Sequence, residues 1–305
     1  MAVNGVFRQP EFLRRGDRVG IVSPAGALQT PHIVEQAAAT LSSWGLQAVV
    51  APHALGRNGY YSGSIQERID DMCLMLNDDT IKAIICSYGG YGCVHLLPHI
   101  CDALGRNPKW IAGMSDCSVL HAAALSQGVM SIHSLQCRHL ATRGSDASSA
   151  FLRDLLFGTF PSYEIESHRL NRLGSASGVL VGGNLSVLSA LASTPYNLFE
   201  PGRVLFIEDV NEPLYKIERM LQSLRLSGVF SSLSALIVGR FVGCNENPVF
   251  GGTVYDVVRN MVEDYSFPVC FGFPVGHSDD CYPLVVGAAV DIKIEAEGVS
   301  VSFCQ

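Results

Sequence analysis

One serine stands where an apolar strand is expected to turn directly into a helix. The segment Trp110-Ile-Ala-Gly-Met-Ser115 has the pattern of a strand that ends in a glycine, and residues 119–127 follow with the spacing of an amphipathic helix. Such a turn can lift a hydroxyl group clear of the backbone, beside the free amides at the start of the helix. Ser115 is therefore a candidate nucleophile. The alternative is that Ser115 or Ser118 only caps the helix, because serine is favoured at that position.

Two other segments contain an acid and a base that a serine nucleophile would need. The strand-like residues 204–207 end in Glu208 and Asp209, and either carboxylate could orient a histidine during acyl transfer. Either could also cap the helix expected near Pro213. Among nine histidines, His277 stands out because a glycine- and proline-bent loop after a strand carries it. The local pattern leaves the choice between the two carboxylates open.

A glycine-rich loop, Tyr88-Gly-Gly-Tyr-Gly92, follows the strand-like residues 83–87. Three glycines in five residues let a ligand approach the backbone amides, which suits an anion or a carbonyl oxygen. A tight strand-to-helix turn without a ligand is the other interpretation. The loop lacks the Gly-Lys-Ser/Thr ending of a phosphate loop and does not match Gly-x-Gly-x-x-Gly, so it gives little support for nucleotide binding.

Two further patterns are weaker. Cys117 is a second candidate nucleophile, but it falls inside the first turn of the helix rather than at its apex. It also takes the place of the second glycine of Gly-x-Ser-x-Gly, which disfavours an esterase of the α/β-hydrolase type. His95 and His99 have helical spacing, but no glutamate follows His95 and Pro98 disturbs the turn, so no metal site is expected.

The elements that must position these residues divide the chain of 305 residues into two expected domains. Residues 1–160 alternate strand-like and helix-like segments, which predicts an α/β domain with a doubly wound parallel sheet and ligands at the carboxyl ends of its strands. Residues 161–177 are polar and indicate a loop-like linker. Residues 178–305 predict a smaller mixed α+β domain, with a hairpin that turns at Glu297-Gly298.

The composition excludes several classes of partner. The net charge of −7 and the absence of a long basic run argue against nucleic acid and anionic membrane surfaces. Ten cysteines without a Cys-x-x-Cys pair indicate free thiols in a reducing compartment. No signal-peptide core is apparent, and no apolar stretch is long enough to span a bilayer. We therefore expect a cytoplasmic protein that acts on small neutral or zwitterionic substrates.

Six segments, taken together in order and spacing, resemble one known family. They are residues 13–25, 88–92, 113–116, 182–185, 206–212 and 276–277. They are similar to the serine LD-carboxypeptidase family, which includes muropeptide recyclers and microcin-immunity peptidases. The resemblance implies a class I glutamine-amidotransferase-like N-terminal domain. It also implies a triad in which Ser115 is the nucleophile, His277 the general base and Glu208, rather than Asp209, the orienting acid.

The same resemblance implies the remaining site residues and the substrate. Backbone amides of Asp116 and of Gly89 or Gly90 would form the oxyanion hole, and Tyr88 and Asn184 would bind substrate. The expected enzyme is a serine peptidase, without cofactor or metal, that releases a C-terminal D-amino acid, usually D-alanine, from an L-centre of a peptidoglycan tetrapeptide in cell-wall recycling. A small muropeptide is the expected partner, and a homodimer the implied assembly. The alternatives are a related serine acyl hydrolase that cleaves an aminoacyl-nucleotide or another small amide, and a non-catalytic small-molecule-binding protein.

Three positions differ from typical family members. Tyr88 stands where they carry arginine, and Met114 where they carry an aromatic residue or a histidine. His133-Ser-Leu-Gln136 stands where they carry His-Gly-Pro-Met. Losing a cation beside the glycine-rich loop removes a partner for a carboxylate or a phosphate. These differences bear on the substrate rather than on the type of reaction.

Overall fold

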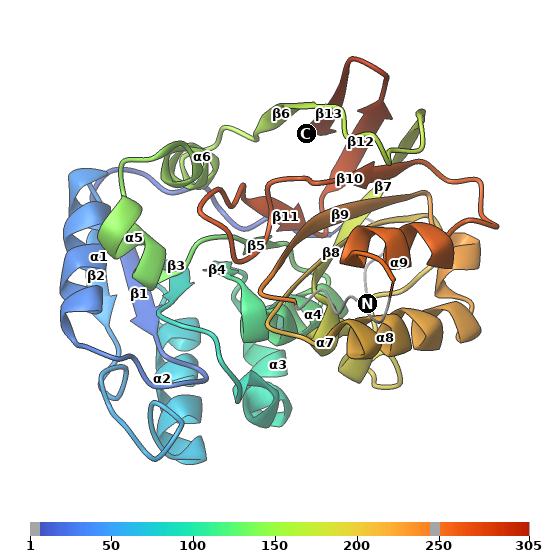
Figure 1. Ribbon diagram of the computed structural model, residues 1–305. Helices are drawn as coiled ribbons and strands as arrows, with labels where there is room; N and C mark the ends of the chain where they lie inside the picture. The colour runs from blue at the N-terminus through green and yellow to red at the C-terminus, as the bar shows by residue number, and fades with distance from the viewer. Residues whose placement is uncertain (1–6, 245–250, 305) are drawn as a thin grey trace. The chain divides into compact units, whose positions relative to one another are not determined.

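The structure is a computed structural model that describes residues 7–244 and 251–304. The chain forms two compact units, whose elements Figure 1 shows. Unit 1 holds the described residues up to Thr159 together with Tyr282–Gly287, and unit 2 holds Phe160–Cys281 and the described residues from Ala288 onward. The chain thus leaves unit 2, contributes one strand to unit 1 and returns, a path that the sequence pattern did not predict.

Unit 1 contains a sheet of six strands in the order β11-β5-β4-β3-β1-β2. The strands are β1 (Arg18–Val22), β2 (Gln47–Val50), β3 (Ile81–Cys86), β4 (Trp110–Gly113), β5 (Ser131–His133) and β11 (Leu284–Val286). The first five are parallel, and β11 pairs antiparallel with β5. The predicted doubly wound parallel sheet is therefore confirmed, with a short antiparallel strand at one edge.

Helices cover both faces of this sheet. They are α1 (His32–Ser43), α2 (Ile65–Asn77), α3 (Leu97–Arg106), α4 (Ser118–Ser126), α5 (Cys137–Arg143) and α6 (Ala147–Leu156). Helix α1 packs on α5, whereas α3 packs on both α2 and α4 (Figure 1). The strand order and the right-handed rule for parallel crossovers place α1 on one face and α2, α3 and α4 on the other. Strands β1, β3 and β4 are therefore almost entirely buried. No helix in the described ranges has the length and apolarity needed to cross a membrane.

Unit 2 contains a sheet of seven strands in the order β10-β9-β8-β7-β12-β13-β6. The strands are β6 (Ser162–Glu166), β7 (Gly174–Asn184), β8 (Arg203–Val210), β9 (Ala235–Val242), β10 (Val269–Phe271), β12 (Ala289–Ile294) and β13 (Gly298–Phe303). Strands β7 to β10 are parallel, and β12, β13 and β6 continue the sheet antiparallel. Helix α8 (Leu214–Leu226) packs between α7 (Leu185–Leu191) and α9 (Val254–Met261). The predicted α+β character and the hairpin between β12 and β13 are confirmed.

The expectation of a loop-like linker over residues 161–177 is wrong for both ends of the segment. This segment contains all of β6 and the first residues of β7. Strand β6 lies at the edge of the sheet, where Tyr163 is buried while Glu164 and Glu166 are exposed. Residues 167–173 between the two strands are irregular, so the loop expectation holds for this connection only.

Candidate active site

Ser115 lies at the turn between β4 and α4 and has a left-handed backbone. Its φ angle is 63°, and among the described non-glycine residues only Asn211 shares a positive value. A short 3-10 turn, Ser115–Cys117, leads from the strand into α4. Left-handed φ is strained for a residue with a side chain, and it is typical of sharp strand-to-helix turns that present a nucleophile. The predicted strand-to-helix turn is confirmed.

Neither candidate serine is the residue that caps the helix. The N-cap of the 3-10 turn is Met114, and the N-cap of α4 is Cys117, neither of which makes a side-chain capping hydrogen bond. Ser118 is already the first residue of α4 and is buried. The helix-capping interpretation of Ser115 and Ser118 is therefore wrong.

The glycine-rich loop approaches Ser115 more closely than a residue with a side chain could. A Cβ atom built on Gly89 would lie 2.7 Å from Ser115 Cβ and 2.9 Å from Ser115 Oγ. Gly90 has a φ of +90°, and a Cβ there would lie 2.7 Å from Tyr60 Oη. Backbone of the loop thus lies directly beside the serine, which is where amides of an oxyanion hole are needed.

Two buried side chains that the sequence analysis did not single out support this turn. Gln136 Nε2 donates a hydrogen bond of 2.8 Å to the carbonyl of Met114. His121 Nε2 donates to the carbonyl of Gly113 at 2.9 Å, and its Nδ1 accepts from Ser131 Oγ at 2.9 Å. Burial lowers the pKa of His121, which keeps the ring neutral for this arrangement. Gln136 ends residues 133–136, where the chain differs from typical family members. That difference was the one sequence feature that could have pointed to its role.

In unit 2, Glu208 and His277 form a direct pair. His277 Nδ1 donates to Glu208 Oε2 at 2.8 Å; the carboxylate is fully buried and the imidazole is 20% exposed. Gly276 makes this possible, because its φ is +121° and a Cβ there would lie 2.9 Å from Glu208 Oε2. A carboxylate on Nδ1 fixes the tautomer that leaves Nε2 able to accept a proton.

Asp209 points to a different set of partners from those of Glu208. Its carboxylate accepts hydrogen bonds from Asn184 Nδ2 at 2.8 Å, from the Ser186 amide at 2.9 Å and from Ser186 Oγ at 2.7 Å. Burial raises the pKa of Asp209. Asn184 also caps α7 by accepting from the amide of Val187 at 3.3 Å. Asn184 therefore has a structural role, and its expected contact with substrate stays a prediction.

Comparison with known proteins identifies the family. Residues 19–134 match the LD-carboxypeptidase N-terminal domain, and residues 177–292 match the LD-carboxypeptidase C-terminal domain. A probable murein peptide carboxypeptidase of Bacillus subtilis is 32% identical over 305 residues, covering 94% of this chain and 92% of that protein. The chain belongs to the LD-carboxypeptidase family. The resemblance found in the sequence is thus confirmed, and the protein is a carboxypeptidase.

Two further relatives of this LD-carboxypeptidase are informative. The crystal structure of a muramoyltetrapeptide carboxypeptidase from Oxalobacter formigenes has a TM-score of 0.87 at 25% identity, covering 94% of this chain and 99% of that one. The Microcin C7 self-immunity protein MccF of Escherichia coli is 24% identical over 294 residues, covering 83% of each protein.

Tyr88 and the candidate metal ligand His95 each have close neighbours in unit 1. Tyr88 is half-buried, and its ring lies 3.2 Å from the position of a Cβ built on Gly26. His95 Nδ1 lies 3.2 Å from Arg68 Nη2, and its ring packs edge-on against that of Tyr91. Tyr91 itself is exposed. Within the two described ranges, no three His, Cys, Asp or Glu side chains gather in a way that could hold a metal ion.

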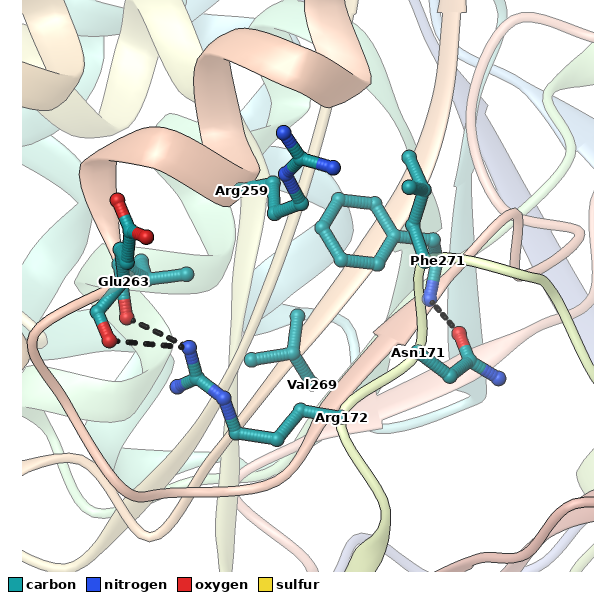
Figure 2. A pocket seen from close by; sticks show the side chains of 8 residues that line it. Asn171, Arg172, Arg259, Glu263, Val269 and Phe271 are labelled. Carbon is teal, nitrogen blue, oxygen red and sulfur yellow. Dashed lines mark hydrogen bonds between the residues drawn. The ribbon is translucent and has the colours of Figure 1, made fainter.

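A hollow of about 520 Å³ in unit 2 lies beside β10, the strand that leads to His277 (Figure 2). Its lining residues are Leu170, Asn171, Arg172, Arg259, Val262, Glu263, Val269 and Phe271. Arg172 donates to the carbonyls of Val262 at 2.9 Å and Tyr265 at 2.5 Å, and Asn171 Oδ1 accepts from the Phe271 amide at 2.7 Å. Arg172 thus holds the end of α9 in place, and Asn171 holds β10, the strand before the His277 loop.

Replacing Arg172 by alanine is expected to lower the free energy of unfolding by about 2 kcal/mol, because several backbone carbonyls lose a charged donor. Chemical denaturation measures this loss. Arg259→Ala is the matched control, since Arg259 lines the same hollow but is exposed. Equal stability of the two variants would contradict the bracing role of Arg172.

Replacing Gly89 by alanine is expected to lower kcat about 100-fold, because the new methyl group must displace either Ser115 or the loop beside it. Steady-state kinetics on a peptide substrate measures the effect. Gly16→Ala is the control: Gly16 also sits in a turn, with φ +93° and no atom within 4 Å of a built Cβ, so it should lose some stability but keep kcat. An unchanged kcat in Gly89→Ala would show that the close approach is not needed for activity.

Proposed function

We propose that this LD-carboxypeptidase is a serine peptidase that releases D-alanine from the C-terminus of a peptidoglycan tetrapeptide, by cutting the bond after an L-configured centre. The observation that carries the proposal is the left-handed backbone of Ser115 at the turn between β4 and α4. The names of the relatives, a murein peptide carboxypeptidase and a muramoyltetrapeptide carboxypeptidase, support the choice of substrate.

In the proposed mechanism, Ser115 Oγ attacks the scissile carbonyl carbon while His277 Nε2 takes the hydroxyl proton. Glu208 holds the ring through Nδ1 and stabilises the imidazolium that forms. Backbone amides of Asp116 and of Gly89 or Gly90 stabilise the negative oxygen of the tetrahedral intermediate. His277 then gives the proton to the amine of the departing D-alanine, and water hydrolyses the acyl-enzyme.

The test uses two tetrapeptides that differ only in the configuration of the last residue. We expect mass spectrometry to detect the tripeptide from the isomer that ends in D-alanine and not from the one that ends in L-alanine. A fluorophosphonate probe should label Ser115 in the same preparation, because it reacts with activated serines. A folded protein that releases no D-alanine would overturn the proposed substrate, and a failure to label Ser115 would favour a non-catalytic binding protein.

A second candidate is hydrolysis of an amide that links an amino acid to a nucleotide. The relative named as a Microcin C7 self-immunity protein supports it. Competition between the tetrapeptide and an aminoacyl-nucleotide amide separates the two candidates. A higher kcat/KM for the nucleotide would favour the second.

A further inference from the structure

The glycine-rich loop ends in a peptide group that is bonded on both sides by buried charged residues. Arg68 Nη1 donates to the carbonyl oxygen of Gly92 at 2.9 Å, and the amide of Cys93 donates to Asp116 Oδ2 at 2.7 Å. The carbonyl and the amide belong to the same peptide unit. A cation at the oxygen and an anion at the N–H polarise that unit in the same direction, so each charge-assisted bond strengthens the other.

Both charged groups are buried away from water, which strengthens their hydrogen bonds to the peptide group. Arg68 is 2% exposed and Asp116 is 4% exposed. The same Arg68 Nη1 also donates to the carbonyl of Pro24 at 2.9 Å, so it links the turn after β1 to the loop after β3. The guanidinium lies 4.8 Å from the centre of the Tyr61 ring, which adds a cation–π contact.

Glycine at position 92 gives the guanidinium the space that it occupies. A Cβ on Gly92 would lie 2.6 Å from Arg68 Nη1, and the φ angle of Gly92 is +137°. The third glycine of the loop therefore serves the contact with Arg68, whereas the first, Gly89, serves the contact with Ser115. One end of the loop thus lies against Ser115, and the other end is bonded to Asp116, the chain neighbour of Ser115.

We propose that Arg68 and Asp116 are a pair of positioning residues that act through the Gly92–Cys93 peptide group to hold the glycine-rich loop against Ser115. This inference rests on the proposed catalytic role of Ser115. The loop amides must lie where negative charge develops in the transition state, and a displacement of about 1 Å can lower the rate about 100-fold. Burial raises the pKa of Asp116 to about 6, so the carboxylate is ionised at neutral pH and able to accept the Cys93 bond.

The first test is a double-mutant cycle with Arg68→Met and Asp116→Leu, which replace each charged group by an apolar one of similar size. Each single variant should lower kcat about 10- to 100-fold and change KM by less than about threefold. The double variant should be no slower than the slower single variant, because both changes release the same peptide group. Arg68→Lys and Asp116→Asn, which keep a donor and an acceptor, should recover part of the rate. If the losses of kcat in the two single variants added up in the double variant, Arg68 and Asp116 would act independently and the proposal would be wrong.

The second test does not depend on activity. Arg68→Met should accelerate hydrogen exchange of the Cys93 amide, measured by NMR, although Arg68 bonds the other side of that peptide group. Asp71→Asn is the control, because Asp71 is a buried carboxylate on the same helix that bonds His53 instead. Unchanged exchange of the Cys93 amide in Arg68→Met would refute the inference. If the wild type released no D-alanine, the proposed function would fail while this measurement still tested the pair.

Discussion

Replacement of Ser115 by alanine is expected to lower kcat for D-alanine release by about 10⁴-fold or more, since losing the nucleophile of a triad has an effect of this size. Thermal unfolding should change little, because the side chain is small and only partly buried. The measurement is D-alanine release under single-turnover conditions. Ser126→Ala is the matched control: Ser126 ends the same helix, and its hydroxyl donates to the carbonyl of Ala123 and accepts from Gln127 Nε2.

A Ser115→Ala variant that keeps more than a few per cent of the wild-type rate would contradict the assignment. The remaining candidate in this part of the chain is then Cys117. Its thiol is fully buried, and Gln136 Nε2 lies 3.6 Å from its Sγ atom. Full activity of Cys117→Ser together with loss of activity in Ser115→Ala would exclude the thiol as the nucleophile.

We expect Glu208→Gln to lose activity and Asp209→Asn to lose stability. Glu208→Gln should lower kcat by about 10²- to 10⁴-fold, because a neutral amide no longer stabilises the imidazolium of His277. Asp209→Asn should instead lower the free energy of unfolding by about 1–3 kcal/mol, because its carboxylate accepts several donors at the start of α7. Kinetics and chemical denaturation of both variants measure the two effects.

The neighbouring carboxylates are each other's control, since they are adjacent in β8 and both are buried. The opposite pattern, with a slow but stable Asp209→Asn and an active but unstable Glu208→Gln, would move the orienting role to Asp209. Loss of stability without loss of kcat in Glu208→Gln would make the contact with His277 merely structural.

The sequence pattern located the strands that consist of a clear apolar run. Strands β3, β4 and β8 overlap the expected strand residues 83–87, 110–113 and 204–207, because short apolar runs end at glycine or other turn residues. The pattern did not reveal β6, whose outward residues are polar, or β5, which has only three residues. Strand β11 joins the sheet of unit 1 from a point far along the chain, and no local pattern encodes such a pairing.

The candidate site shows the same division. Motif order, through the family resemblance, pointed to Ser115, His277 and Glu208. Without that resemblance nothing in the residues separates Glu208 from Asp209, because the two are neighbours near the end of β8. Alternate residues of a strand face opposite ways, and only the loop before His277 and the start of α7 give the two carboxylates different partners.

The sequence by itself therefore determined the family, the parallel sheet of unit 1 and the turn that carries Ser115, because hydrophobic periodicity and turn residues act between neighbours in the chain. The resemblance already implied that Glu208 orients His277, whereas tertiary structure alone decided that Asp209 bonds Ser186 and that Arg68 and Asp116 meet at one peptide group. These contacts join segments that are distant along the chain. They form only when packing removes the segments from water and brings their polar groups within hydrogen-bond reach.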